Sequence, residues 1–346
     1  MSAARKRRKG KRGRIPLPRR IALRAFLALA FGYAVLAYAA LVFVHQPKAW
    51  RAEREEAWPG FAVATLYWIG NGLGDITDGL GLTGRDVVYD YDTDPPSGSV
   101  LFAGAPRRTG NIQPDDITIL DRGEFVVGWS PSLRRPVWCA YHVTQDELYP
   151  AGKRPAFTKD REAANSPAPG AYDHSGYHRG HMVPNHAIES RYGSAEQKKT
   201  FMMSNIAPQT AALNCGVWRD LEHRIADLWP RRYGEIWVVV GSIPNDMKET
   251  LSGSDIEVPS RFFQVVVAQE GMDVRAFAVL FDQNVSWHEW AARHLVTIDE
   301  LEELSGLDFL PDLPGFIQKP LEAELPTRLW PVNFADIFRQ FLLRFG

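Results

Sequence analysis

The chain has 346 residues, with 40 Lys+Arg against 41 Asp+Glu, 45% hydrophobic and 12% aromatic residues. This is the composition of a globular protein with a sizeable core, and it excludes a chain that is disordered throughout. Two cysteines, Cys139 and Cys215, exclude a disulfide framework and a CxxC zinc knuckle. One bridge between them and two free thiols both stay open.

The N-terminus is strongly basic and precedes an apolar run. Residues 1–24 hold eleven Lys and Arg and no acid, which leaves 29 basic against 41 acidic residues in the rest of the chain. Ala25–Val44 carry no charge and as a helix would span about 30 Å. We therefore predict a single-pass membrane protein with residues 1–24 cytoplasmic, membrane attachment through Ala25–Val44 and a non-cytoplasmic catalytic domain. A cleaved signal that yields a secreted protein, and a buried core helix, are the alternatives.

Residues 45–115 are rich in Gly, Asp and Pro and are predicted to form a linker or stalk. After them the pattern predicts a hairpin with strands in 123–130 and 134–143, and further strands at Glu235–Gly241, Arg261–Ala268 and Arg275–Phe281. Helices are predicted at Asn214–Trp229, Trp287–Arg293 and Ile298–Ser305. Strands interleaved with helices and joined by long loops predict an α+β fold.

The first stretch that carries chemistry is Gly176–His186, GYHRGHMVPNH. Hydrolysis of a phosphodiester needs a base near neutral pH, a cation to offset phosphate charge, and a backbone that can approach the substrate. His181, Arg179 and Gly180 supply these three elements. The simpler interpretation of each histidine is a satisfied or exposed polar residue, and His178 with His181 also fits half of a zinc site.

The second stretch runs from Phe201 to Glu222 and contains FMMSNIAPQ and LNCGVWRDLE. If Asn214 opens a helix, Glu222 lies two turns further along the same face. An amide oxygen and a carboxylate could then face one hard cation, directly or through its water shell, which suits Mg²⁺. The alternative makes Asn214 an N-cap and Glu222 a solvated helix residue.

Together these stretches resemble the DNA/RNA non-specific endonuclease family, which includes Serratia-type nucleases and mitochondrial endonuclease G. The motifs that carry the resemblance are S-G-Y-x-R-G-H-x-x-P, F-x-x-S-N-x-x-P-Q and L-N-x-x-x-W-x-x-L-E, after an R-x-P-x-W hairpin. The resemblance covers residues 116–314 and implies a ββα-metal (His-Me finger) domain with a mainly antiparallel central sheet flanked by helices. Residues 315–346 lie outside it and are predicted to be a tail that is helical at its end.

The resemblance also implies roles for individual residues. His181, at the end of a β element, would be the general base, and Asn214, on the helix that faces it, would bind Mg²⁺, with Mn²⁺ or another divalent cation as alternatives. Glu222 would hold metal-bound waters and Arg179 would bind phosphate. Neighbouring groups would be oriented by a second set, which comprises His178, Gly180, Asn205 and Gln209. The products from DNA and RNA would carry 5′-phosphates.

One position departs from the family pattern, because His178 stands where the family usually has Asp. Normal activity, an altered metal or pH dependence, and a site that only binds are the three outcomes open at this stage. Two alternatives to a nuclease stay open, namely a phosphodiesterase acting on smaller nucleotides and a catalytically degenerate, membrane-tethered module that binds nucleic acid or a partner. A bridge between Cys139 and Cys215 would brace the metal helix. The sequence indicates no oligomeric state.

Overall fold

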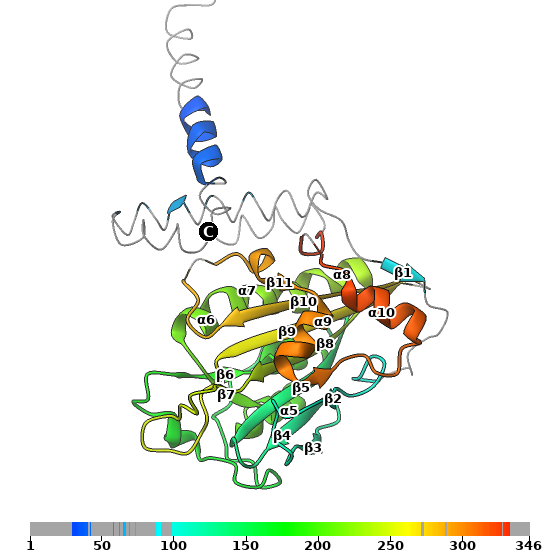
Figure 1. Ribbon diagram of the computed structural model, residues 1–346. Coiled ribbons are helices and arrows are strands. Elements are labelled where there is room, and N and C mark those ends of the chain that lie inside the picture. Colours follow the sequence, from blue (N-terminus) through cyan, green and yellow to red (C-terminus); the bar gives the residue numbers. More distant parts are fainter. Residues whose placement is uncertain are drawn as a thin grey trace, which may run out of the picture. The chain divides into compact units, whose positions relative to one another are not determined.

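The computed structural model describes residues 30–40, 99–270, 273–287, 289–326 and 328–332, a few isolated residues between 42 and 73, and the backbone of strand β1 (Figure 1). The chain divides into two compact units, Met1–Leu73 and Gly74–Gly346. Both motif stretches belong to the second unit.

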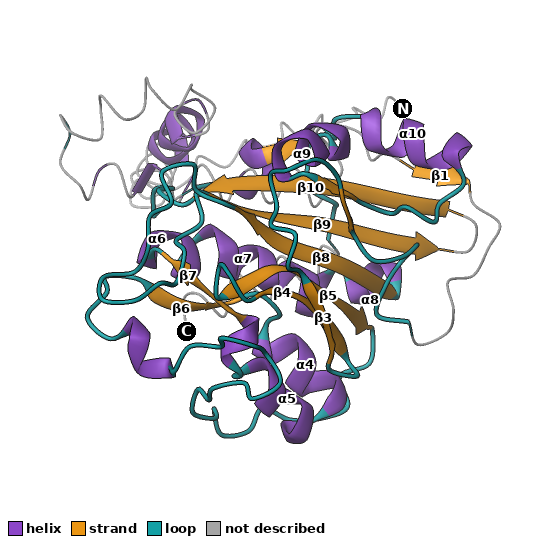
Figure 2. Ribbon diagram, turned by 60° about the horizontal axis from the view of Figure 1, so that its bottom comes forward, coloured by secondary structure: helices purple, strands orange, loops and turns teal. Residues whose placement is uncertain are grey.

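An eight-stranded antiparallel sheet forms the centre of the second unit (Figure 2). Its order is β1-β10-β9-β8-β5-β4-β3, with β11 paired to β10. The bounds are β1 Val88–Asp90, β3 Thr118–Asp121, β4 Phe125–Ser130, β5 Arg135–Thr144, β8 Glu235–Ile243, β9 Arg261–Glu270, β10 Asp273–Asp282 and β11 Leu295–Val296. Two short pairs lie outside this sheet, namely β2 (Arg107–Arg108) with β12 (Leu307–Asp308), and β6 (His178–His181) with β7 (Ile206–Gln209).

Both faces of the sheet are buried. In β9, Phe262 and Val266 pack into one hydrophobic core, whereas Phe263 and Val265 pack into the other. This alternation follows from the two-residue period of a strand. Near-continuous apolar runs such as that of β9 are typical of strands covered on both sides.

Helices cover the two faces separately (Figure 2). Helices α4, α6, α7 and α8 contribute to the first core, and α9 and α10 to the second. The α-helical bounds are α4 Asn185–Tyr192, α5 Ser194–Thr200, α6 Ala211–Cys215, α7 Val217–His223, α8 Pro230–Tyr233, α9 Ile298–Ser305 and α10 Gly315–Ala323. The 3₁₀ helices are η1 Pro169–Tyr172, η2 Met203–Asn205 and η4 Ala291–His294, and η3 Arg224–Leu228 is a π-helix. The predicted mixed fold with a central antiparallel sheet is confirmed.

Two of the predicted helices differ from the structure. The helix predicted over Asn214–Trp229 is interrupted at Gly216, whose backbone is not helical (φ −102°, ψ −120°). A Cβ on Gly216 would lie 2.3 Å from the carbonyl oxygen of Ala212, so only glycine fits at this break. The helix predicted over Trp287–Arg293 is reduced to η4, because Trp290 is extended.

The transmembrane helix predicted over Ala25–Val44 is not found in the part of this range that the structure describes. Within this range the structure describes helical residues at 30–40 and 42, and residues 25–29, 41, 43 and 44 lie outside the described residues. Among the described residues, no helix combines the length and the apolar character needed to cross a membrane. The basic segment 1–24 is also outside the described residues.

The packed domain extends beyond both of its predicted ends. Phe102, which falls in the predicted linker 45–115, is buried in the second core, and β2 pairs with β12. At the other end, residues 328–332, here called the C-terminal strap, place Leu329 and Trp330 in the first core. The indole nitrogen of Trp229 donates to the carbonyl oxygen of Trp330 over 3.0 Å. Residues 333–346, and with them the predicted helical end of the tail, lie outside the described residues.

Candidate functional site

Strands β6 and β7 bring the two motif stretches together as an antiparallel pair. His178 lies opposite Gln209, and His181 lies opposite Ile206. Because side chains alternate along a strand, His178 and Gly180 share one face of β6, and Arg179 and His181 share the other. The predicted base is therefore the last residue of β6, as expected, but it faces away from His178.

Gly180 is where β6 packs most closely against β7. A Cβ there would lie 2.1 Å from Oε1 of Gln209, so the absence of a side chain admits Gln209 across the strand. Gln209 is fully buried, and neither its Oε1 nor its Nε2 has a hydrogen-bond partner. The side chain of Gln209 therefore packs directly against the backbone of β6 at Gly180.

His181 is 8% exposed and packs against two aromatic rings, which also contact each other. Its ring centroid is 5.4 Å from that of Phe157 and 4.7 Å from that of Phe201. Burial lowers the pKa of His181 to about 3, with the positive charge of Arg154 as the smaller cause. The imidazole is therefore neutral near pH 7, and its Nε2 has no hydrogen-bond partner. A neutral imidazole is the form that accepts a proton, but a pKa this far below 7 makes it a weak base in this environment.

Arg179 lies on the same face of β6 as His181, and its guanidinium is bound by neighbouring groups of the protein. Its Nε and Nη2 donate to the carbonyl oxygen of Pro169 over 3.0 and 2.8 Å, and Nη2 also pairs with Asp173. The guanidinium carbon lies 5.6 Å from the ring centroid of Phe157. Arg179 and His181 thus flank the same aromatic ring.

Asn205 is fully buried, and its side chain is fully engaged by the backbone. Its Oδ1 accepts from the amide of Val183 over 2.9 Å, and its Nδ2 donates to the carbonyl oxygens of Val183 and Thr200. These bonds fasten the segment after His181 to the segment before β7. Asn205 therefore positions the neighbouring backbone, and its side-chain amide has no hydrogen left to donate to a substrate.

Asn214 lies inside α6 and is not its N-cap. Thr210 caps the helix instead, because its hydroxyl accepts from the amide of Leu213. The Nδ2 of Asn214 lies 3.1 Å from Nδ1 of His178, and Oδ1 has no hydrogen-bond partner among the described residues. An amide oxygen is left available at the start of β6.

Glu222 lies on α7, beyond the break at Gly216. Its Oε1 accepts from the indole nitrogen of Trp218 over 3.0 Å. Burial raises the pKa of Glu222 to about 8, although the Trp218 hydrogen bond and the charge of Arg219 lower it. A nearby cation would offset this burial penalty. The prediction that Asn214 and Glu222 lie on one face of a single helix is therefore wrong, because Gly216 separates α6 from α7.

The two cysteines are free, so the bridge considered from the sequence is absent. Cys139 is fully buried in β5, where its Sγ lies 3.7 Å from Oδ1 of Asn205. Cys215 follows Asn214, and its Sγ lies 3.7 Å from Nδ1 of His178. Each thiol therefore has its own neighbours.

A residue absent from the sequence motifs joins β7 to α6. The side chain of Gln283, just after β10, accepts from the amide of Thr210 over 2.9 Å and donates to the carbonyl oxygens of Pro208 (2.9 Å) and Pro259 (3.2 Å). The Thr210 hydroxyl donates to the Gln283 carbonyl oxygen over 2.6 Å. Gln283 is 5% exposed. Gln283 therefore holds the turn between β7 and α6, and this turn sets the position of α6 beside the β6–β7 pair.

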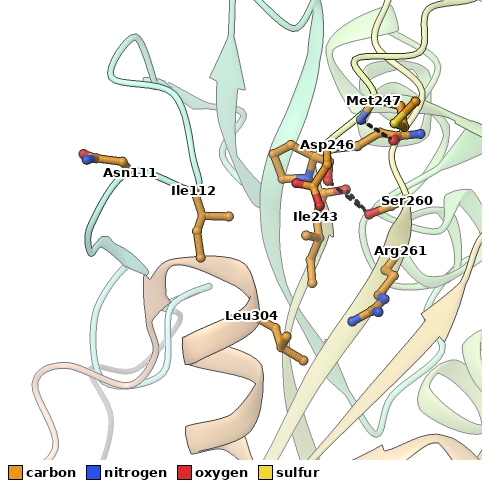
Figure 3. A pocket seen from close by; sticks show the side chains of 10 residues that line it. Asn111, Ile112, Ile243, Asp246, Met247, Ser260, Arg261 and Leu304 are labelled. Atoms are coloured by element: carbon orange, nitrogen blue, oxygen red, sulfur yellow. Dashed lines mark hydrogen bonds between the residues drawn. The ribbon is translucent and has the colours of Figure 1, made fainter.

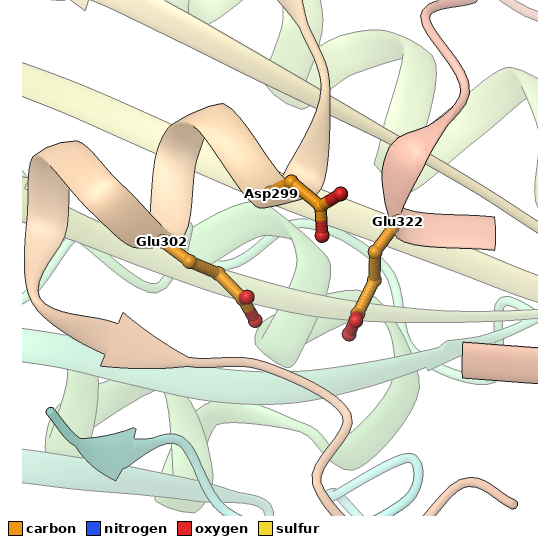
Figure 4. A group of neighbouring side chains, drawn as sticks. All are labelled: Asp299, Glu302 and Glu322. Carbon is orange, nitrogen blue, oxygen red and sulfur yellow. The ribbon is translucent and has the colours of Figure 1, made fainter. Parts of the chain in front are cut away.

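Two other features lie away from these motifs. A cleft of about 810 Å³ is lined by residues that include Ile243, Arg261 and Leu304, and by none from either motif stretch (Figure 3). Asp299 and Glu302 of α9 and Glu322 of α10 point toward one another (Figure 4). Burial raises the pKa of Glu302 to about 7 and that of Glu322 to about 8. Helices α9 and α10 cover the sheet face opposite α6 and α7.

Both motif stretches lie in a part of the chain that matches a known family in sequence. A family model described as DNA/RNA non-specific endonuclease matches residues 104–316, more than half of the chain. The chain belongs to this family. The match begins before the predicted start of the domain at 116, in agreement with the burial of Phe102.

Three relatives illustrate the likeness to DNA/RNA non-specific endonucleases. Nuclease EXOG, mitochondrial, of Xenopus laevis is 27% identical over 209 residues, which cover 54% of this chain and 56% of that protein. The nuclease of Serratia marcescens is 29% identical (54% and 73% covered), and human endonuclease G, mitochondrial, is 27% identical (56% and 69%). The chain thus spans just over half the length of the EXOG nucleases that it matches.

A solved structure supports the fold. The structure titled as the EndoG/EndoGI complex aligns with a TM-score of 0.50 at 22% identity, over 59% of this chain and 89% of that one. At this identity the likeness bears on the fold alone.

The predicted localisation is corrected by these findings. A single-pass membrane protein was predicted from the apolar run, but no described helix is suited to cross a membrane. The EXOG and endonuclease G relatives carry the word mitochondrial in their names. The apolar run alone was therefore an insufficient basis for a membrane topology.

Proposed function

We propose that the protein is a metal-dependent, sequence-non-specific endonuclease that hydrolyses phosphodiester bonds of DNA and RNA and leaves 5′-phosphates. The observation that carries this proposal is that one short strand, β6, begins with His178 in contact with Asn214 of α6 and ends with the buried, neutral His181. The nuclease names of the relatives support the same activity class.

His181 is proposed as the general base. Its neutral imidazole and unpartnered Nε2 would take a proton from the attacking water. Arg179 and Arg154 would place positive charge near the phosphate, because Arg179 contacts the same Phe157 ring as His181 and Arg154 lies over the Phe201 ring. His178 would occupy the position next to the cation in place of the usual carboxylate.

The available donors suit a divalent cation. Asn214 offers an amide oxygen without a hydrogen-bond partner among the described residues, and Glu222 offers a half-buried carboxyl group suited to metal-bound waters. When bound, the cation would stabilise charge on the phosphate and on the leaving oxygen. The resemblance makes Mg²⁺ the expected ion. Gln209 and Gly180 would keep β6 and β7 closely packed, and Asn205 would hold the segment after β6 to the segment before β7.

Supercoiled plasmid and single-stranded RNA incubated with the full chain test this proposal. Both should be degraded with Mg²⁺ and neither with EDTA, and plasmids of unrelated sequence should be cut equally. The new ends should be ligatable without added kinase, as 5′-phosphates are. Cleavage confined to a dinucleotide ester would favour the phosphodiesterase alternative. Binding of DNA without cleavage at any metal concentration would favour a degenerate site.

Gln283→Leu should weaken metal binding at this site. The variant keeps the size of the side chain but leaves the Thr210 amide and two buried carbonyl oxygens unpaired, each at a cost of about 1–3 kcal/mol. We expect α6 to shift and the affinity for Mg²⁺, measured by calorimetry, to fall about tenfold or more.

Gln113→Leu is the matched control for Gln283→Leu. Gln113 is also buried, and its Nε2 donates to the carbonyl oxygen of Ser305 on the other side of the sheet. Denaturant unfolding should show both variants destabilised, whereas only Gln283→Leu should lose metal affinity. Equal loss of affinity in both variants would mean that Gln283 contributes stability and not position.

A further inference from the structure

Three donor side chains converge where β6 meets α6. Nδ1 of His178 lies 3.1 Å from Nδ2 of Asn214 and 3.7 Å from Sγ of Cys215, and Nδ2 of Asn214 lies 3.7 Å from the same Sγ. These three atoms form an isosceles triangle with sides of 3.1, 3.7 and 3.7 Å. Rotation of the Asn214 amide by 180° exchanges Nδ2 for Oδ1 and turns the triangle into a nitrogen, sulfur and oxygen set.

The dimensions of this triangle are those of one face of a tetrahedral metal site. With Zn–S of about 2.3 Å and Zn–N of about 2.0–2.1 Å, tetrahedral angles separate a sulfur and a nitrogen ligand by about 3.6 Å. The observed separation of Cys215 Sγ and His178 Nδ1 is 3.7 Å. A nitrogen and an oxygen ligand would be about 3.3–3.4 Å apart, against 3.1 Å here. Small side-chain shifts would suffice to close the site.

We infer that His178, Cys215 and Asn214 form a binding site for Zn²⁺ and similar soft divalent cations, which compete there with Mg²⁺. The inference rests on the proposed function, in which Asn214 is a metal ligand. Three protein donors leave the fourth tetrahedral position open, as in catalytic zinc sites.

The chemistry of these donor atoms favours the binding of Zn²⁺ over that of Mg²⁺. Thiolate and imidazole are borderline or soft ligands that favour Zn²⁺ and Co²⁺, whereas Mg²⁺ prefers oxygen and retains its waters. The Cys215 thiol would release its proton on binding. His178 is exposed and Cys215 half-buried, so an ion can reach both. Cys139, by contrast, is fully buried.

Co²⁺ titration of the metal-stripped full chain gives a direct test, because a Co²⁺–thiolate bond produces a charge-transfer absorption in the near ultraviolet. We expect one equivalent of Co²⁺ to produce this band and one equivalent of Zn²⁺ to remove it, even with Mg²⁺ in large excess. Cys215→Ser should lack the band and bind Zn²⁺ at least 10–100-fold more weakly.

Cys139→Ser is the matched control, since its hydroxyl can still donate to Asn205, and it should keep the band. Wild-type protein without the band, or Cys215→Ser with the wild-type band, would overturn the inference. Cleavage assays with Mg²⁺ separate the two proposals. Wild-type protein that cleaves but shows no band contradicts only the zinc site, and protein that shows the band but does not cleave contradicts only the nuclease function.

Discussion

His181→Ala should abolish phosphodiester cleavage, with a fall in kcat/KM of about 10²–10⁴-fold or more, the range for loss of a general base. The variant removes the buried imidazole whose Nε2 has no partner, and leaves the hairpin, Arg179 and Asn214 in place. The affinity for DNA should change little, because loss of the His181 side chain does not alter the contacts that other residues make with the phosphates. Steady-state cleavage of plasmid and a binding titration measure the two quantities.

Two variants of His178 serve as controls for His181→Ala. His178→Ala should reduce cleavage less than His181→Ala does, because His178 is exposed and faces Asn214 instead of the aromatic pocket. His178→Asp restores the residue usual in the family, and should preserve or raise cleavage with Mg²⁺. If folded His178→Ala protein is as inactive as His181→Ala, the roles assigned to the two histidines are reversed or shared.

Asn214→Ala should lose metal-dependent cleavage by more than about 100-fold, since even residues that only orient a metal ligand cost 10–100-fold when they are removed. The side-chain amide of Asn214 contacts only His178 and Cys215 among the described residues, so we expect its removal to leave folding almost unchanged. Calorimetric titration with Mg²⁺ should show the loss directly, alongside the cleavage assay.

Asn214→Asp is the companion to Asn214→Ala, because it keeps an oxygen donor at the same position. It should retain measurable metal binding, whereas Asn214→Ala should not. Thermal unfolding should place both variants within a few degrees of the wild type. An Asn214→Ala protein that binds Mg²⁺ normally and still cleaves would show that the cation is held elsewhere.

Elements with strong local signals were predictable from the sequence. The predicted strands at 235–241, 261–268 and 275–281 correspond to β8, β9 and β10, whose apolar runs can be buried only between two layers of helices. Helix α9 was predicted with its observed bounds, since Thr297 caps its start and Gly306, in the left-handed region, ends it. Where tertiary contacts override local preference, as at Gly216 and Trp290, the prediction was less accurate.

The candidate site was only partly predictable. The spacing of the motifs identified the residues of β6 and α6, because that chemistry is concentrated in short stretches. Gln283 and Arg154 had no such signal: they lie far along the chain from the residues that they contact, and only folding brings them close. The contact between His178 and Asn214 could likewise not be read from residues 36 positions apart.

The C-terminal strap separates two boundaries that are often treated as one. Sequence likeness to the family ends at residue 316, whereas the hydrophobic core of this protein continues through Leu329 and Trp330. The strap covers Trp229 and Phe277, whose ring centroids lie 5.5 and 5.0 Å from that of Trp330. A chain cut where the family match ends would therefore lose the cover over these two core side chains.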